Sequence, residues 1–210
     1  MVQPGEFDWE EVLKRYKPPI VPRYVFLFSG HMIDTPGREH PRFPPEKEHI
    51  AAQKISEALD QLDAGPGDLA LTQGACGGDL LFTEACLLLG VKVNWLQPFR
   101  EPHFIQESVV RCGESWRKRY LDAKAKLAAS ILSAPDVLGE PPPGSTQSYP
   151  YERCNLWLLN TALSMGPEKV RFICLWDGGG GDAPGGTADM VNEVKRRTGK
   201  EATWIDVRKL

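Results

Sequence analysis

Short apolar runs alternate with segments of helical periodicity along most of the chain, and this alternation constrains the fold more than any other feature. The runs at 24–30 (YVFLFSG), 69–75 (LALTQGA) and 91–99 (VKVNWLQPF) are compact and bounded by glycine or proline, which is typical of buried strands. Between them, residues 46–62 and 77–90 have the length and the apolar spacing of helices. A strand–helix–strand–helix–strand order favours a parallel sheet covered by helices.

The second half of the chain continues this pattern. It offers two more strands and three helical segments, the strands at 169–176 and 201–207 and the helices at 101–133 (with a break near 112–115), 151–166 and 187–199. Residues 133–150 are rich in proline, glycine and serine, which predicts a loop. In the helix at 46–62 the apolar side chains share one stripe, which consists of Ile50, Ala51, Ile55, Ala58, Leu59 and Leu62.

Together these segments predict a single domain. We expect an α/β fold over residues 24–210, a Rossmann-like three-layer sandwich whose mainly parallel sheet has five strands in the order 3-2-1-4-5. Residues 1–23 are expected to form an N-terminal extension, in which 6–16 is a candidate short helix ended by prolines. A length of 210 residues is enough for one well-covered core.

Composition and charge exclude several classes of protein. Apolar residues make up 41% of the chain and charged residues 25%, the balance of a soluble globular protein. The formal net charge of -3 disfavours a nucleic-acid partner, and no apolar run approaches the roughly 20 residues that span a bilayer. The charged N-terminus lacks the apolar region of a secretory signal, so we expect a cytoplasmic protein without a membrane segment.

The cysteines and histidines fit the same expectation. The five cysteines are scattered, odd in number and never form a CxxC pair, which agrees with a cytoplasmic address. Cys86 and Cys174 lie in apolar runs and are expected to be small core residues. The four histidines show no metal-ligand spacing, so no metal site is expected.

Three strands run directly into polar or glycine-rich turns, FSGHMID, TQGACGGD and WDGGGGDAPGGT. Because the carboxyl ends of parallel strands lie along one edge of the sheet, these turns should meet there. Ligands of such sheets bind in the crevice at that edge, at a switch in strand order. The alternative is that the glycines only make tight turns between strands and helices. Three such turns on one edge favour a ligand crevice.

Several side chains in the first two turns are candidates for ligand contact. Asp79 opens the second helix, where it either caps free backbone amides or binds the hydroxyls of a ribose. His31 directly follows the first strand, where it is either structural or functional. Arg38 and Arg42 either meet a phosphate or are solvated at the surface. Glu84, in the second turn of an apolar helix, is either a carboxylate of the crevice or an ion-paired surface group.

The third turn and two later segments add further candidates. Gly185, Gly186 and Thr187 open a helix, where Thr187 either caps the helix or binds phosphate with the neighbouring amides. This is neither a Walker motif nor a GxGxxG fingerprint. Arg153 and Asn155 start another helix that is expected to reach the same edge. The stretch RCGESWRKRY is basic and aromatic, but one such stretch in an acidic protein is more typical of a solvated helix face than of a nucleic-acid site.

The chain resembles the SLOG superfamily, the Rossmann-like group that includes the cytokinin-activating LOG phosphoribohydrolases and DprA-like proteins. GACGGDLLFTEACLLLGVKVNWLQPF resembles its second strand–helix–strand unit, and PYERCNLWLL is similar to its Arg-x-Asn helix start. APGGTADMV is similar to its Pro-Gly-Gly-x-Gly-Thr loop, one residue shorter, and FSGHMID occupies the position of its first strand. The resemblance covers roughly residues 24–207.

The resemblance implies a crevice for a nucleotide or a nucleotide-derived ligand, in a sensor or in an enzyme. The hydrolases of the group cleave the N-glycosidic bond of nucleoside monophosphates with an arginine and a glutamate near the glycine–threonine loop. Asp189 stands at the position of that glutamate and is a shorter carboxylate, and Asp79 has no clear counterpart. These two differences from the hydrolases of the group concern catalysis more than ligand binding.

We therefore expect binding or sensing of a nucleotide-derived small molecule, with no required cofactor. The alternative is a phosphoribohydrolase-like N-glycosidase in which Asp189, Glu84 or Asp79 is the acid–base carboxylate. Homo-oligomerisation and fusion to, or pairing with, an effector are both left open. The expected ligand-binding residues lie in the three turns and at the Arg-x-Asn helix start: Ser29, Gly30, His31, Arg38, Gly74, Gly77, Gly78, Asp79, Arg153, Asn155, Asp177, Gly178, Gly185, Gly186 and Thr187.

Overall fold

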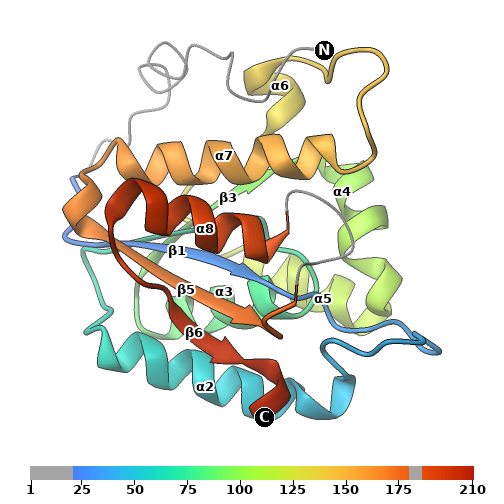
Figure 1. The fold of residues 1–210 in the computed structure, drawn as a ribbon, viewed down its shortest axis with the longest axis horizontal. Coiled ribbons are helices and arrows are strands. Elements are labelled where there is room, and N and C mark those ends of the chain that lie inside the picture. Colours follow the sequence, from blue (N-terminus) through green and yellow to red (C-terminus); the bar gives the residue numbers. More distant parts are fainter. Residues whose placement is uncertain (1–20, 180–185) are drawn as a thin grey trace.

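The protein is built on one six-stranded sheet in which every pair of neighbouring strands is parallel (Figure 1). The computed structural model describes residues 21–179 and 186–210. The sheet order is β4-β3-β2-β1-β5-β6, with strands β1 (Val25–Gly30), β2 (Leu69–Thr72), β3 (Lys92–Gln97), β4 (Leu132–Ser133), β5 (Val170–Trp176) and β6 (Thr203–Asp206). The predicted order is confirmed, and the sheet is longer by β4, a two-residue edge strand.

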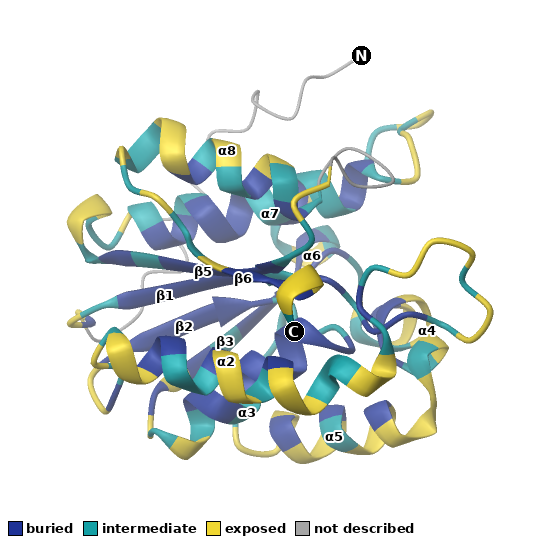
Figure 2. Cartoon of the chain, turned by 60° about the horizontal axis from the view of Figure 1, so that its bottom comes forward, coloured by how far each residue is buried: buried dark blue, intermediate teal, exposed yellow. Residues whose placement is uncertain are grey.

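Helices cover both faces of the sheet and make a three-layer sandwich (Figures 1 and 2). One face carries α2 (Glu48–Gln61), α3 (Gly78–Leu88) and α5 (Glu114–Lys124). The other face carries α7 (Tyr149–Leu163) and α8 (Thr187–Thr198), with the short α6 (Ala134–Leu138) beside α7. Helix α4 (Glu101–Ser108) lies at the end of the sheet to which the strands point. The predicted fold class is confirmed.

The two layers of helices correspond to two apolar clusters separated by the sheet. Side chains alternate along β1, so Phe26 and Phe28 pack with α2, α3 and α5, whereas Val25 and Leu27 pack with α7 and α8. Burial on both faces explains why the strands read as continuous apolar runs (Figure 2). The outer faces of the helices are exposed.

The helix ends follow local sequence signals. Pro45 opens the 3-10 turn η1 (Pro45–Lys47) that leads into α2, a position where the missing amide costs nothing. Gly199 at the end of α8 has a left-handed conformation, and the last turn of that helix carries Lys195, Arg196 and Arg197, whose charges suit a helix carboxyl end. Three further 3-10 turns are η2 (Val110–Cys112), η3 (Pro167–Lys169) and η4 (Val207–Lys209).

Three predictions about elements and packing are wrong in part. The helical segment at 101–133 ends at Lys124, and its last two residues form strand β4 instead. The predicted loop at 133–150 contains the short helix α6, and its last two residues belong to α7. In the predicted apolar stripe, Ile50 is 42% exposed and Leu62 is partly exposed, because the buried face of α2 is formed by Ala51, Ile55, Ala58 and Leu59. The candidate helix at 6–16 lies outside the described residues.

The cysteines differ from one another in a way that their spacing did not indicate. Cys76 and Cys112 form a disulfide, although they lie 36 positions apart and neither is part of a CxxC pair. Cys86 and Cys174 are buried free thiols, as predicted, and so is Cys154. No helix within the described ranges is long and apolar enough to cross a lipid bilayer.

Candidate functional site

A cavity of about 370 Å³ lies at the carboxyl ends of the strands. It is formed by the end of β1 and the loop after it, the loop after β2, the end of α4, and the starts of α7 and α8. Strands β1 and β5 pair in register from Val25 with Val170 to Gly30 with Leu175, so both end level at this edge. The sheet order reverses between these two strands, which is where ligands of such sheets bind.

The sequence prediction and the lining of the cavity overlap substantially. Eight of the predicted ligand-binding residues line it: Ser29, Gly30, His31, Arg38, Asp79, Asn155, Gly186 and Thr187. Of the described residues, those that line the cavity do not include Gly74, Gly77, Gly78, Arg153, Asp177 or Gly178. Gly185 lies outside the described residues.

Glycine in the loop after β2 is required by packing of the protein against itself. Gly77 has a φ of +86°, and a Cβ there would lie 2.5 Å from the amide nitrogen of Ile33. The Gly78 amide donates to the carbonyl of His31 at 3.0 Å. The loop after β2 therefore packs directly on the loop after β1. These glycines shape the cavity wall but do not line the cavity themselves.

Asp79 closes the same loop and faces the cavity. Its Oδ2 accepts a hydrogen bond from the amide of Ala75 at 3.3 Å. The side chain is buried, and burial raises the pKa of this carboxyl to about 6, although hydrogen bonds from the loop, Ala75 first, oppose the shift. Among the described residues that line the cavity, Asp79 is the only carboxylate. Asp79 can therefore accept hydrogen bonds from the loop amides and face a ligand at the same time.

His31 lies between the cavity and the loop after β5. Burial lowers the pKa of its imidazole, although Asp177 opposes the shift, so the neutral form dominates at pH 7. In that form Nε2 accepts a hydrogen bond from the amide of Asp177 at 3.2 Å. Asp177 itself does not line the cavity, but its Oδ1 accepts from the amide of Gly179 and shapes the turn. Asp177 therefore positions His31.

Two hydroxyls from opposite ends of the chain meet on one wall of the cavity. Ser29 Oγ, at the end of β1, and Thr187 Oγ1, at the start of α8, are 3.1 Å apart. Gly186 precedes Thr187 and also lines the cavity, so the first amides of α8 lie at the same wall. Hydroxyls beside the amino end of a helix suit an anion.

Arginines line another part of the cavity. Arg38 and Arg42 come from the loop after β1, which Asp34 anchors by accepting hydrogen bonds from the amides of Arg42 and Phe43 at 2.8 Å each. Arg111, in η2, is the third. It was not predicted as a site residue because it belongs to the basic stretch that is typical of a solvated helix face. Only the fold brings η2 to this edge.

Helix α7 contributes Tyr151 and Asn155, which are four residues apart and share one helix face. Asn155 Oδ1 accepts a hydrogen bond from Gln73 Nε2 at 2.7 Å, which ties α7 to the loop after β2. Arg153 lies two positions from each on another face and is completely buried, which lowers the pKa of its guanidinium. Tyr151 could have been predicted from the sequence, because it lies four residues before Asn155 and therefore on the same helix face. Arg153, two residues from each, lies on a different face.

The other two candidate carboxylates are not part of the cavity. Glu84 faces α5, where its Oε1 accepts a hydrogen bond from Arg119 Nε at 2.8 Å. Asp189 is exposed on α8, although Ala188 beside it lines the cavity. The structure therefore brings only Asp79 of the three to the predicted crevice.

Two comparisons of the chain with known proteins found no match. No family model matches the chain, and no curated protein matches it. Within residues 21–179 and 186–210, no group of three or more His, Cys, Asp or Glu side chains is arranged to hold a metal ion. The chemistry of the cavity therefore has to be inferred from its own residues.

Proposed function

We propose that this protein is a SLOG-type domain that binds a nucleotide-derived small molecule in the cavity at the carboxyl ends of its strands. The observation that carries the proposal is the position of the cavity, at the point where the strand order reverses between β1 and β5. Its volume of about 370 Å³ lies in the range of small-molecule sites. Described residues from all four SLOG-like sequence segments line this same cavity.

The lining offers a partner for each part of a nucleotide. Ser29, Thr187 and the first amides of α8 suit a phosphate, because hydroxyls and helix amides donate to its oxygens. Asp79 suits the hydroxyls of a ribose, since a carboxylate accepts from both. Tyr151 and Trp176 offer aromatic surface to a base. Arg38, Arg42 and Arg111 add positive charge that favours an anionic ligand.

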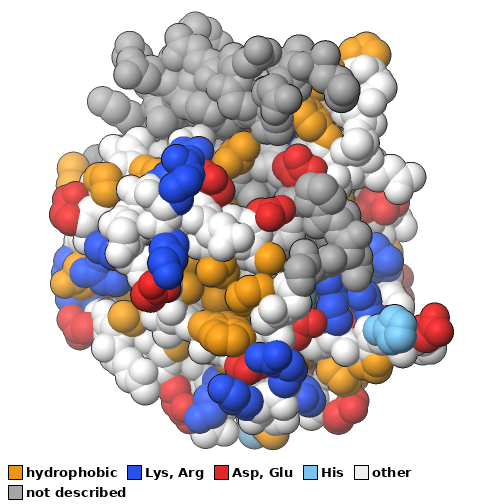
Figure 3. Space-filling view, viewed as in Figure 1, with side chains coloured by type: hydrophobic (Ala, Val, Ile, Leu, Met, Phe, Trp, Pro, Cys, Tyr) orange, Lys and Arg blue, Asp and Glu red, His pale blue; other side chains and the backbone are white. Residues whose placement is uncertain are grey.

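The face shown in Figure 3 supports a small molecule over a nucleic acid. On the face shown in Figure 3, the positively and negatively charged side chains of the described residues are interspersed. A nucleic-acid site would need a basic stripe on which phosphates could be neutralised. A cytoplasmic location, and pairing with a second copy or an effector, stay predictions from the sequence.

Calorimetry with a ligand panel tests this proposal. The panel contains AMP, ADP-ribose and cyclic AMP, with adenosine and ribose 5-phosphate as partial ligands. We expect at least one nucleotide to bind, and Ser29→Ala with Thr187→Val to weaken it. Ser164→Ala is the control, because Ser164 lies at the far end of α7 and donates to Thr161. Binding of an unrelated metabolite, with no response to any nucleotide, would refute the proposal.

A second candidate function is hydrolysis of the N-glycosidic bond of a nucleoside monophosphate. Asp79 favours it, because a buried carboxyl of raised pKa in the cavity suits acid–base work near neutral pH. Water would attack C1′ of the ribose, the bond from C1′ to the base would break, and the base would leave with a proton. Release of adenine from AMP, lost in Asp79→Asn and kept in Asp189→Asn, would support this function. Activity that survives Asp79→Asn would exclude this mechanism.

A further inference from the structure

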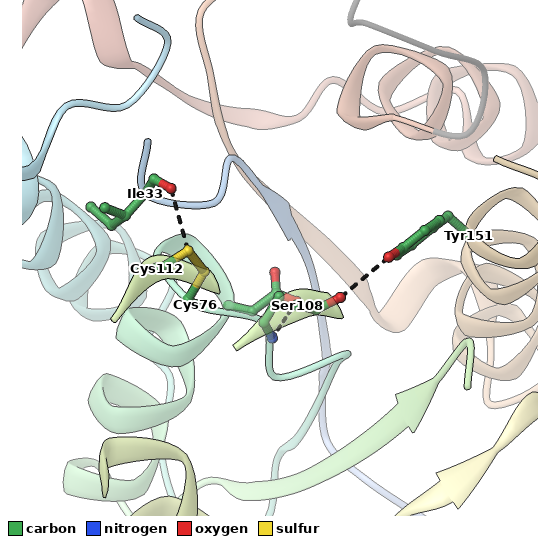
Figure 4. Close-up of a disulfide and its surroundings, with 7 residues drawn as sticks. Ile33, Cys76, Ser108, Cys112 and Tyr151 are labelled. Atoms are coloured by element: carbon green, nitrogen blue, oxygen red, sulfur yellow. Dashed lines mark hydrogen bonds between the residues drawn. A yellow bond between two sulfur atoms is a disulfide. The ribbon is translucent and has the colours of Figure 1, made fainter. Parts of the chain in front are cut away.

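The disulfide between Cys76 and Cys112 joins two walls of the cavity (Figure 4). Cys76 belongs to the loop after β2, next to Ala75, which lines the cavity. Cys112 ends η2, next to Arg111, which also lines the cavity. Their Cα atoms are 6.4 Å apart. The bond is therefore a direct link between the glycine-rich loop and the segment that carries Arg111.

Hydrogen bonds extend this link to α7. The amide of Cys76 donates to the carbonyl of Ser108 at 2.8 Å, and Ser108 Oγ lies 3.3 Å from the hydroxyl of Tyr151 (Figure 4). Ser108 and Tyr151 both line the cavity. A change at the disulfide thus reaches the wall of the cavity through adjacent residues.

The reduced form has a hydrogen-bond acceptor already in place. Cys112 Sγ lies 3.4 Å from the carbonyl oxygen of Ile33, in the loop after β1 (Figure 4). A sulfur in a disulfide has no proton to donate, whereas the thiol of reduced Cys112 does. Ile33 also lines the cavity, so each redox state gives Cys112 a different partner beside it.

The Cys76–Cys112 disulfide is reached by solvent at Cys112. The protein also does not need this bond to make up for a small apolar core. Cys76 is 1% exposed, whereas Cys112 is partly exposed, so a reductant meets Cys112 first. Disulfides that staple a fold are typical of small domains with too little apolar core. This chain has an apolar cluster on each face of its sheet.

We propose that the Cys76–Cys112 disulfide is a reversible redox switch that fixes the cavity wall around Ser108 and Arg111 when oxidised and releases it when reduced. A thiolate of a dithiol reductant attacks Cys112 Sγ, the sulfur–sulfur bond breaks, and Cys76 leaves as a thiolate that takes up a proton. The second thiol of the reductant attacks the mixed disulfide and frees Cys112 as a thiol. Two electrons and two protons pass to the protein, and the reductant becomes a disulfide.

Hydrogen exchange of the full chain, with and without dithiothreitol, tests the switch without any ligand. We expect faster exchange on reduction in residues 73–78 and 104–113, with β1 and β5 unchanged. Cys112→Ser should exchange like the reduced protein, and Cys86→Ala should respond to the reductant as the wild type does, since Cys86 is a buried free thiol. Unchanged exchange in both segments overturns the proposal. Loss of protection throughout the sheet also overturns it, because the bond would then only hold the fold together.

Control of ligand affinity by this switch rests on the proposed function, and AMP is the probe. Calorimetry should give about fivefold weaker AMP binding to the reduced protein, at the lower end of typical coupling between sites. By reciprocity, saturating AMP should make the disulfide about fivefold harder to reduce, a shift of about 20 mV for two electrons. Equal AMP affinity in both states overturns the control of affinity and leaves nucleotide binding intact. Absence of AMP binding in both states counts against the proposed function, and hydrogen exchange then decides the switch alone.

Discussion

At the scale of single residues, Gly77 combines a backbone conformation reserved for glycine with a close contact between two loops. We predict that Gly77→Ala destabilises the protein by about 2 kcal/mol more than Gly139→Ala does, because overpacking typically costs 1–3 kcal/mol. Gly139 also has a positive φ and extended ψ, but a Cβ there meets no atom within 4 Å. The two variants share the backbone strain and differ in the contact with Ile33. Urea unfolding measures the difference, and equal losses would show that the contact is unimportant.

A second prediction at this scale concerns Asp79 and pH. Burial raises its pKa from 3.8 to about 6, so the native state holds a proton that the unfolded state releases between these values. The stability from this group is present below pH 3.8 and is lost as pH rises through about 6, by about 3 kcal/mol in total. Asp79→Asn carries no such proton, so its stability relative to the wild type should rise by most of that amount between pH 4 and pH 7. Urea unfolding at several pH values measures this, and parallel curves would contradict it.

Single residues also show what the sequence could predict about the site. Residues that end a strand or start a helix, such as Ser29, His31 and Thr187, line the cavity, because these strand and helix ends lie at one edge of the sheet. Their contact with a ligand stays a prediction. Arg153 does not line the cavity, because its helix was predicted but the rotation of that helix was not. Each residue turns a helix by about 100°, so a register uncertainty of two residues moves a side chain to another face.

At the scale of elements, one arginine of α5 bonds to both α2 and α3 beside it. Arg119 donates to Glu84 from α3 and, through Nη1, to Glu48 from α2 at 2.6 Å, and its guanidinium lies 4.2 Å from the ring centre of Trp116. A carboxylate used in this way has a structural role. The ion pair with Arg119 explains why Glu84 lies on this face of α3. This pair becomes visible only when α2, α3 and α5 are placed together.

We predict that Glu84→Gln lowers the free energy of unfolding by about 1 kcal/mol, a typical value for a partly exposed ion pair of good geometry. Glu114→Gln is the control, because Glu114 is 78% exposed and lies 3.8 Å from Arg117, so its replacement should change little. Both variants should bind AMP as the wild type does. Thermal and urea unfolding with calorimetry measure these effects. If Glu84→Gln alone lost AMP affinity, Glu84 would have to be counted as a residue of the binding site.

The elements themselves were largely predictable, and the exceptions have a physical cause. Strands buried on both faces gave continuous apolar runs, and the repeated strand–helix order indicated a parallel sheet. The segment after Lys124 was predicted as helix because its periodicity continues, but pairing of Leu132 and Ser133 with β3 replaces that periodicity by strand geometry. A two-residue strand has too few side chains to show an alternating pattern, so tertiary pairing alone determines it.

At the scale of the whole molecule, the two ends of the parallel sheet have different roles. The carboxyl ends carry the cavity, whereas the amino ends of β1 and β2 carry a compact ionic cluster. There Asp68, whose side chain is completely buried, accepts hydrogen bonds from Arg23 at 2.8 and 3.0 Å and from the amides of Tyr24 and Gly65. These bonds hold the pKa of Asp68 below its ordinary value despite its burial. They fasten the starts of the two strands together.

This division predicts that stability and binding can be changed separately. Asp68→Asn replaces charged acceptors at the amino ends and should cost about 2 kcal/mol, since hydrogen bonds to charged groups contribute about 1.5–3 kcal/mol. Its AMP affinity should not change, because the whole length of the strands separates Asp68 from the cavity. Arg111→Ala should do the reverse, with about tenfold weaker AMP binding and a change in stability within about 0.5 kcal/mol, because Arg111 is an exposed charge beside the cavity. Urea unfolding and calorimetry on both variants make the comparison. If Asp68→Asn weakened AMP binding as much as Arg111→Ala, the two ends of the sheet would be coupled, and the binding site could not be assigned to the carboxyl ends alone.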